Sequence, residues 1–440
     1  MSAVLDPQRT LAELKELREL TSDQHGAQRV AFSDAWVRAR DWLASKLAEL
    51  PVETHRDAAG NLWSTLVGDS PQALLLGGHM DSVPNGGWLD GCLNTLAGLE
   101  VMRRFIGEFD GRPPVTIRLV DWADEEGARF GKSLFGSSAF SGHLDMAEAR
   151  QLTDKDGISL PEALGRVDIS FENVLEAQIE RAGAFAYLEL HIEQGPVLLD
   201  LGLPLGVVAG TFGVERHAIS FTGQAAHSGS TPMKRRKDAF LAAARMAPEI
   251  HRIADRHGGV CTIGSCVTKP GIVTSVAAEC HITLDQRHLD PQALAAMRDE
   301  AMTASRHFAD ETGCTVAWSR LCHIAPVHFD PQLIAFACEA VEEISGSCHT
   351  LPSGPLHDAS EVSRSGIPTA MIFVQSLHGL SHNAIEDTHE DDIVLAIRAL
   401  DRLASKAIRC ATVSPGQAGS SRQSLYSTRT RICFEYPPVS

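Results

Sequence analysis

The 440-residue sequence lacks an apolar run of membrane-spanning length, lacks a Cys-x-x-Cys pair and lacks an excess of positive charge. Without a spanning run, we expect no membrane partner. The ten cysteines lie scattered among apolar stretches, which argues against a secreted disulfide framework and indicates buried thiols in a reducing cytosol. Lys and Arg number 39 against 56 Asp and Glu, a net charge of −17. This balance argues against nucleic acid, because phosphate groups select for basic proteins.

The N-terminal sequence also lacks the pattern of a signal peptide. The first twenty residues carry acidic side chains and no continuous apolar core, so we expect a cytoplasmic protein. The hydrophobic fraction of 44% and the charged fraction of 22% are ordinary for a globular protein, and the length is sufficient for two domains. The polar, Gly/Ser-rich segment 413–440 has no periodicity and is predicted to be a disordered tail.

The stretch 74–91 (LLLGGHMDSVPNGGWLDG) organises the rest of the chain. Residues 73–76 have the length of a buried strand, and His79 and Asp81 follow where open α/β sheets place their chemistry. Asp90 comes after a turn-rich segment. An imidazole and carboxylates in this position suit a metal site. They equally suit a strand cap followed by two turn residues.

Three further apolar segments, 115–120, 186–192 and 369–374, are also predicted to be strands that lead to polar residues. The polar residues at or after their ends are Asp121, Asp124, Glu125, Glu126, His191 and His382. Adjacent carboxylates repel unless a cation neutralises them, although a solvated acidic loop is the commoner alternative. The strand ends together offer three imidazoles and two carboxylates, enough for two divalent ions with one bridging carboxylate. Such ligands without thiolate suit zinc, manganese, cobalt or nickel.

The middle of the chain has a different pattern. Residues 211–325 predict the order βαββαβ, which indicates a ferredoxin-like small domain. Residues 1–210 and 326–412 then form an α/β catalytic domain with a central mixed sheet flanked by helices. His227 lies in a Gly/Ser-rich loop of the small domain. The basic run 234–237 nearby is either a solvated face or an attraction for an anionic substrate.

Five segments spread over residues 77–388 carry a family resemblance. They are GHMDSVPNGGWLDG, DEEGARFG, LHIEQGP, HSGSTPMKRRKDA and GLSHNAIEDT. On these segments the chain resembles the dinuclear metallohydrolases of the aminoacylase and carboxypeptidase-like superfamily. More narrowly, it is similar to the branch of N-carbamoyl-L-amino acid hydrolases and allantoate amidohydrolases.

The resemblance implies roles for individual residues. The metal ligands would be His79, Asp90 and His191 for one ion, and Asp90, Glu126 and His382 for the other, with Zn²⁺ expected first and Mn²⁺, Co²⁺ or Ni²⁺ as alternatives. Asp81 would orient the His79 ring, and the Asp90–Gly91 peptide would be cis. Glu125 would be the general base. His227 would donate to the oxyanion, within one chain or across a homodimer. The small domain would serve as a lid and form the dimer.

The resemblance also implies contacts with a small anionic substrate, at Gln194, His227, Thr274, Arg287 and Leu356. For Arg287, a strand-end surface arginine is an equal alternative. The segments around Thr274 and Leu356 depart from the family pattern, where Asn-Val-Ile-Pro and Gly-Ala-Gly-His-Asp are usual. These departures leave a bulkier or differently anchored N-acyl or N-carbamoyl compound open as the substrate. The resemblance implies hydrolysis of N-carbamoyl-L-amino acids to amino acid, carbon dioxide and ammonia. Allantoate, N-acyl amino acids and a non-catalytic metal-binding scaffold are the alternatives.

Overall fold

The computed structural model describes residues 4–412, and these residues form two compact units. Of the described residues, 4–209 and 329–412 belong to the first unit and 210–328 to the second. The segment 413–440, predicted to be a tail, lies outside the described residues. Within the described part of the chain, no helix is both long and apolar enough to cross a bilayer.

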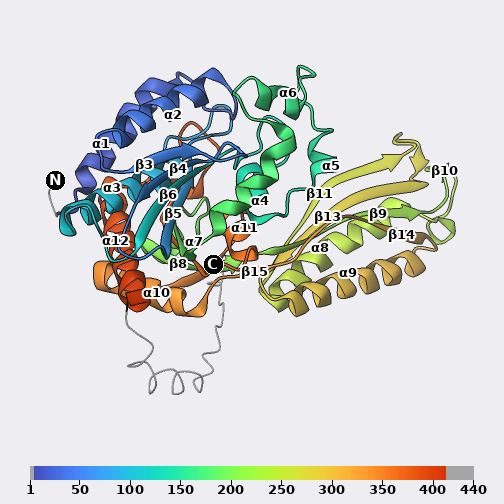
Figure 1. The fold of residues 1–440 in the computed structure, drawn as a ribbon. Helices are drawn as coiled ribbons and strands as arrows, with labels where there is room; N and C mark the ends of the chain where they lie inside the picture. The colour runs from blue at the N-terminus through green and yellow to red at the C-terminus, as the bar shows by residue number, and fades with distance from the viewer. Residues whose placement is uncertain (1–3, 413–440) are drawn as a thin grey trace. The chain divides into compact units, whose positions relative to one another are not determined.

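Most of a nine-stranded mixed sheet belongs to the first unit; its order is β15-β8-β17-β7-β5-β6-β4-β3, β16 pairs with β8, and β15 and the last two residues of β8 fall in the second unit. Strands β3, β4, β5 and β6 of this sheet are labelled in Figure 1. The strands of the sheet are β3 (Glu53–Arg56), β4 (Leu62–Leu66), β5 (Ala73–His79), β6 (Thr116–Trp122), β7 (Ala184–Ile192), β8 (Leu205–Thr211), β15 (Val327–His328), β16 (Thr350–Ser353) and β17 (Thr369–Val374). The four central strands, β17, β7, β5 and β6, are parallel. Their carboxyl ends therefore meet at one edge of the sheet.

The central strands are continuous apolar runs because both faces of a parallel sheet are covered. Every residue of β5 and β17 is buried. Strand β5 is longer than predicted, since it continues through Gly77 and Gly78 to His79. A side chain at Gly77 would place its Cβ 2.3 Å from the Tyr187 hydroxyl, so only glycine allows this close approach.

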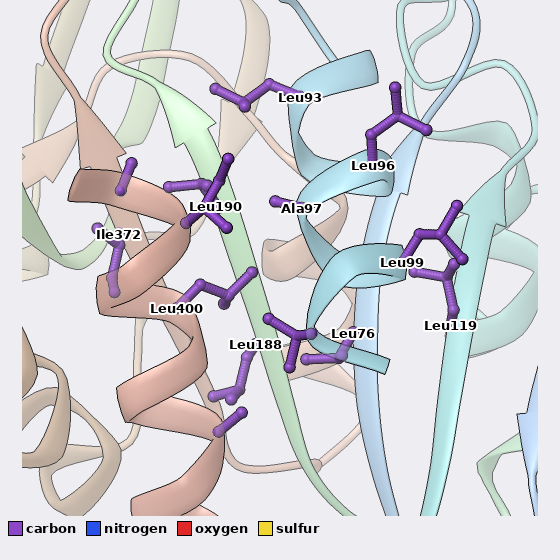
Figure 2. Packing of buried hydrophobic residues seen from close by; sticks show 14 of the residues in the cluster. Leu76, Leu93, Leu96, Ala97, Leu99, Leu119, Leu188, Leu190, Ile372 and Leu400 are labelled. Carbon is purple, nitrogen blue, oxygen red and sulfur yellow. The ribbon is translucent and has the colours of Figure 1, made fainter. Parts of the chain in front are cut away.

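Helices cover both faces of this sheet. They include α1 (Pro7–Thr21), α2 (Asp34–Leu47), α3 (Cys92–Glu108), α4 (Phe135–Ser141), α7 (Val197–Leu201), α10 (Pro331–Ser345), α11 (Asp358–Arg364) and α12 (Glu390–Thr412). Figure 2 shows Leu93 and Leu96 of α3 and Leu400 of α12 among the leucines of the central strands. On the opposite face, the Trp122 ring packs 5.1 Å from Phe140 of α4. The predicted mixed α/β sheet flanked by helices is confirmed.

Some elements were not predicted from the sequence. Residues 143–185 contain only short helices: α5 (Met146–Ala149), α6 (Leu160–Gly165) and the 3₁₀ segment η1 (Phe171–Arg181). Strand β8 was missed because Gly206 and Gly210 interrupt its apolar pattern. At Gly206 a Cβ would lie 2.7 Å from Leu351, so packing requires that glycine. Helix α11 was missed because its start resembles a loop.

The second unit contains β9 (Gly213–Thr222), α8 (Ala239–His257), β11 (Val260–Lys269), β13 (Glu279–His288), α9 (Pro291–Glu311) and β14 (Thr315–Ile324). The strands pair antiparallel in the order β11-β13-β9-β14, and α8 and α9 pack on one face. Two short strands, β10 (Ala226–His227) and β12 (Ser275–Val276), form a separate antiparallel pair. This pair joins the loop that carries His227 to the segment that follows Thr274.

The described cysteines are free thiols. Four are buried as expected, but Cys266 and Cys410 are exposed. Cys266 lies on the edge strand β11 and Cys410 near the end of α12, where packing ends. The interpretation of all of them as buried thiols was therefore wrong for these two.

Candidate active site

The first unit gathers the predicted ligands at the carboxyl ends of its four parallel strands. His79 ends β5, His191 lies one residue before the end of β7, and Glu126 follows β6. His382 lies beyond β17 in the loop after the 3₁₀ turn η3 (Leu377–Gly379). This edge is where parallel α/β sheets place their binding sites, because the strands expose their last residues there without disturbing the core.

Asp90 stands between two groups of potential ligands. Its Oδ1 lies 3.3 Å from Nε2 of His191 and 3.6 Å from Nε2 of His79. Its Oδ2 lies 3.5 Å from Nε2 of His382, whose Nε2 is 3.2 Å from Oε2 of Glu126. The groups His79–Asp90–His191 and Asp90–Glu126–His382 each have a geometry that suits a metal ion. The two oxygens of the Asp90 carboxylate thus face different groups of potential ligands.

Burial separates the two groups. His79, Asp90 and His191 are 1%, 3% and 1% exposed, whereas the His382 side chain is 51% exposed. The second group therefore lies on the open side of the site.

The donor set fits a cation. The Nε2 atom of His79 is buried and has no hydrogen-bond partner, although it faces Asp90 and Glu125. Burial and the charge of Asp90 raise the pKa of Glu126 above its usual value. Burial opposes the ionisation of Asp90, yet its hydrogen bond to His191 and the nearby imidazoles lower its pKa. Carboxylates and imidazoles crowded in this way are stabilised by a bound divalent ion.

Asp81 holds neighbouring residues of the site in place without belonging to either metal-suited group. Its carboxylate accepts the backbone N–H groups of Glu125 (3.2 Å) and Glu126 (3.1 Å), and its Oδ1 lies 3.6 Å from Nδ1 of His79. The backbone carbonyl of Asp81 is closer to that Nδ1, at 3.2 Å. These contacts favour a proton on Nδ1 and leave Nε2 of His79 as a ligand atom. They also fix the two glutamates after β6.

The Asp90–Gly91 peptide differs from the expectation. Among residues 4–412 only Lys269–Pro270 is cis, so the Asp90–Gly91 bond is trans. Gly91 instead has a φ of +70°, and a Cβ there would lie 2.3 Å from Nδ1 of His79. Glycine adopts this conformation readily, and the chain reverses here without the cost of a non-proline cis bond, about 3 kcal/mol.

Glu125 lies beside the ligands without belonging to either group. Its Oε2 is 3.8 Å from Nε2 of His79. Burial, together with the charges of Asp358, Glu126 and Asp90, raises the pKa of Glu125 well above its usual value, in spite of His79. A buried carboxylate with a raised pKa is suited to accepting a proton and passing it on.

Gln194 contacts the central carboxylate. Its Nε2 donates to Oδ2 of Asp90 at 2.8 Å and to Oγ of Ser381 at 3.2 Å. An ionised carboxylate only accepts hydrogen bonds, which fixes the amide orientation and turns Oε1 away from Asp90. That Oε1 atom is buried and has no partner. Gln194 therefore combines an occupied donor with an unused acceptor.

Sequence reasoning missed several residues below the site. Glu189 of β7 accepts from the Tyr187 hydroxyl at 2.6 Å and forms a further metal-suited group with His191 and His357. Glu386 accepts hydrogen bonds around Asp90, and burial raises its pKa to about 7. Glu189 sits between apolar neighbours in a strand, a signal that could have identified it. Glu386 lies in the segment GLSHNAIEDT that carries the resemblance, but its role was not predicted because its partners are distant in sequence.

Asp121, a predicted strand-end acid, has a structural role. Its Oδ1 accepts the Met80 N–H at 2.8 Å, and its Oδ2 lies 2.6 Å from Nε of the buried Arg40. These bonds tie the ends of β5 and β6 to helix α2. Asp121 is thus directed away from the metal-suited groups.

The remaining predicted residues are exposed or half-buried. In the second unit, Nδ1 of His227 accepts the backbone N–H groups of Gly229 (3.1 Å) and Ser230 (3.2 Å). The neutral ring therefore carries its proton on Nε2, which is a donor. Thr274 is exposed, and its carbonyl accepts the Ser228 N–H at 3.0 Å, which binds it to the His227 loop.

Arg287 lies on β13 and donates from Nε to Asp285 at 2.8 Å. Arg216 of β9 donates to the same carboxylate at 2.6 Å. Two guanidinium groups thus pair with one carboxylate. In the first unit, Leu356 is half-buried directly before His357, whose ring lies 4.4 Å from that of His191.

Known proteins resemble this chain over most of its length. An N-carbamoyl-L-amino acid amidohydrolase of Geobacillus stearothermophilus is 34% identical over 405 residues, covering 90% of this chain and 97% of its own. An allantoate amidohydrolase of Escherichia coli (strain K12) is 31% identical over 379 residues, which cover 85% of this chain and 91% of that protein. The crystal structure of a hydantoinase/carbamoylase family amidase from Burkholderia multivorans superposes with a TM-score of 0.83 at 30% identity. The superposition covers 92% of this chain and 98% of that chain.

These similarities confirm the predicted resemblance. The family model for peptidase family M20/M25/M40 matches residues 75–406, a range that contains all five residues of the two metal-suited groups. The chain belongs to peptidase family M20/M25/M40.

Proposed function

We propose that this protein is a cytoplasmic, metal-dependent amidohydrolase that cleaves N-carbamoyl-L-amino acids to the L-amino acid, carbon dioxide and ammonia. The observation that carries the proposal is the carboxylate of Asp90, whose two oxygens face two separate groups of potential ligands. The relatives named for N-carbamoyl-L-amino acid and allantoate hydrolysis support a hydrolase of carbon–nitrogen bonds other than peptide bonds.

Two divalent ions, with Zn²⁺ expected first, would be held by His79, Asp90 and His191 and by Asp90, Glu126 and His382. When bound, such ions polarise a carbonyl and lower the pKa of water. The rest of the chemistry falls to the side chains around them.

Glu125 is the general base. It takes a proton from the attacking water and returns it to the nitrogen that leaves, so one water is consumed per bond broken. The carbamic acid that results decomposes to carbon dioxide and the remaining amine, which is ammonia or the amino acid, depending on the bond that was cleaved. Burial of Glu125 supports this role, because a carboxylate in a low-dielectric site binds a proton more readily.

His227 is the donor to the developing oxyanion through Nε2–H, and Arg287 binds the carboxylate of the amino acid. The guanidinium of Arg287 suits this role because it can donate two parallel hydrogen bonds to a carboxylate. Thr274 and Leu356 contribute to the same end of the substrate. We further propose a homodimer formed through the second unit, so that His227 acts within one chain or across the dimer.

The carbamoyl group is favoured over a simple acyl group by Gln194. Its buried Oε1 has no partner and is an acceptor for an N–H of the substrate. A carbamoyl NH₂ offers that donor, whereas an acetyl group has only a methyl at the same position. An unpaired buried acceptor discriminates strongly against a ligand that lacks the donor. Allantoate also carries carbamoyl NH₂ groups and is the second candidate.

A substrate panel tests the proposal. The protein is stripped with a chelator, reloaded with Zn²⁺ or Mn²⁺, and supplied with the N-carbamoyl and N-acetyl derivatives of one L-amino acid and with allantoate. We expect ammonia and free α-amine in equal amounts from the N-carbamoyl compound. Preferred turnover of allantoate or of the N-acetyl compound would reassign the substrate. Metal binding without hydrolysis of any of these compounds would leave the non-catalytic metal-binding scaffold and contradict the proposal.

A further inference from the structure

Glu386 is a buried carboxylate outside both metal-suited groups, and it holds the main chain at Asp90. It is 2% exposed. Its Oε1 accepts the backbone N–H groups of Leu89 at 3.2 Å and of Asp90 at 3.0 Å, across 296 residues of sequence in the latter case. One oxygen of Glu386 therefore fixes the turn that presents Asp90.

The other oxygen of Glu386 reaches the Asp90 side chain through a serine. Oε2 of Glu386 lies 2.7 Å from the Ser381 hydroxyl, and that hydroxyl lies 3.0 Å from Oδ2 of Asp90. A hydroxyl donates one hydrogen bond, so Ser381 donates to one of these two carboxylates at a time. Glu386 thus holds Asp90 directly at its backbone, and it holds Ser381 beside the Asp90 oxygen that faces the second group. Ser381 also directly precedes His382, so the same contact fixes the loop that carries this ligand.

The contact is tightly packed. At Gly87 a Cβ would lie 2.1 Å from Oε1 of Glu386, so the carboxylate sits directly against the turn 87–90. Within the loop, the Glu386 N–H donates to the Asn383 carbonyl at 2.9 Å. The 381–386 loop and the 87–90 turn are therefore joined through one side chain.

This arrangement matters because the terminal torsion of an aspartate is soft. Rotation about χ2 of Asp has broad minima, so the plane of a carboxylate is set by its hydrogen bonds. Asp90 needs one orientation in which Oδ1 faces His191 while Oδ2 faces His382. Outer partners of metal ligands that set such orientations usually change metal affinity about 10- to 100-fold when they are removed.

We propose that Glu386 is a positioning residue of the metal centre, which orients Asp90 through the Leu89–Asp90 backbone and Ser381 and places His382 beside it. The inference rests on the proposed function, because it concerns the same two-ion site. It assigns Glu386 no contact with substrate.

The test measures Zn²⁺ binding by the full-length protein rather than turnover. The variants are Glu386→Ala, Glu386→Gln and Ser381→Ala, with Asp387→Ala as the matched control. Asp387 is the next residue and bonds the same turn through Nε1 of Trp88 at 3.2 Å, but no hydrogen bond joins it to Asp90 or Ser381 in the described residues. Zn²⁺ is counted by mass spectrometry after gel filtration, and affinity is measured by competition with a chromophoric chelator.

We expect two ions per wild-type chain and an affinity for the weaker ion that falls about 10- to 100-fold in Glu386→Ala. Glu386→Gln should recover part of this loss, because its amide oxygen still accepts the two backbone N–H groups. Ser381→Ala should lower the affinity for the same ion, and Asp387→Ala should leave the affinity for both ions unchanged. Circular dichroism checks that each variant is folded. If Glu386→Ala does not fold, Ser381→Ala, which removes one hydroxyl, decides the matter.

The inference is overturned if folded Glu386→Ala and Ser381→Ala bind two ions with wild-type affinity, or if Asp387→Ala weakens binding equally. In those cases the proposed function stands, because wild-type protein still binds two ions. A wild-type chain that binds no Zn²⁺ contradicts the proposed function instead. The two failures are therefore distinguishable.

Discussion

The metal-suited groups of the first unit and the proposed substrate residues of the second are built in different ways. His79, Asp90 and His191 are almost fully buried at strand ends, and each contacts other charged side chains. His227 is exposed in a loop, where local backbone N–H groups orient its ring. Buried charges need partners in fixed places, whereas an exposed loop changes with little effect on stability. The metal-suited groups and the proposed oxyanion donor are thus under different physical constraints.

The largest effect is expected from the loss of the proposed general base, which should lower turnover while metal binding is retained. Glu125→Gln should lower kcat on the order of 10³-fold, since an amide does not take the proton from water. Zn²⁺ content should stay at the wild-type value, because Glu125 lies outside both groups. Glu126→Gln is the matched control, and it should lose metal as well as activity. Equal metal loss in both variants would show that the neighbouring glutamates do not divide these roles.

A smaller effect should follow from the second unit. His227→Ala should lower kcat about 10²-fold by removing one donor to the oxyanion. Metal content and thermal stability should remain unchanged, because the ring is exposed and bonds only its own loop. His281→Ala, in the same unit but bonded to Ser220 and Glu279, should retain full activity. If both substitutions have the same effect, general damage to the unit explains the loss.

The smallest effect concerns affinity for the substrate. Arg287→Lys should raise KM about tenfold with little change in kcat, because lysine keeps the charge but loses the two-pronged donor. Arg216→Lys, which alters the other partner of Asp285, should change KM less. Steady-state kinetics with the N-carbamoyl substrate measure both. A KM unchanged in Arg287→Lys would place the substrate carboxylate elsewhere.

The sequence predicted the sheet and five candidate ligands that the fold brings together, because both are signalled locally. An apolar run that stops at His79 or at the acids after β6 marks the end of a buried strand, and parallel strands bring such ends together. The resemblance then assigned the partners. Strand β8 was not predicted because its glycines break the pattern that a strand normally shows.

The support around the ligands could not be predicted. Glu386 and Ser381 lie in a polar loop that has no periodicity, and their contacts with Asp90 cross nearly 300 residues. The trans Asp90–Gly91 peptide likewise depends on how Gly91 packs against His79. Hydrogen bonds between distant loops are set by the fold as a whole.

The most direct test of the central claim is anomalous diffraction at the zinc edge from crystals of the Zn²⁺-loaded protein. The account predicts two peaks, one beside His79 and His191 and one beside Glu126 and His382, with Asp90 in contact with both. A single peak, or two peaks that do not share Asp90, would contradict it.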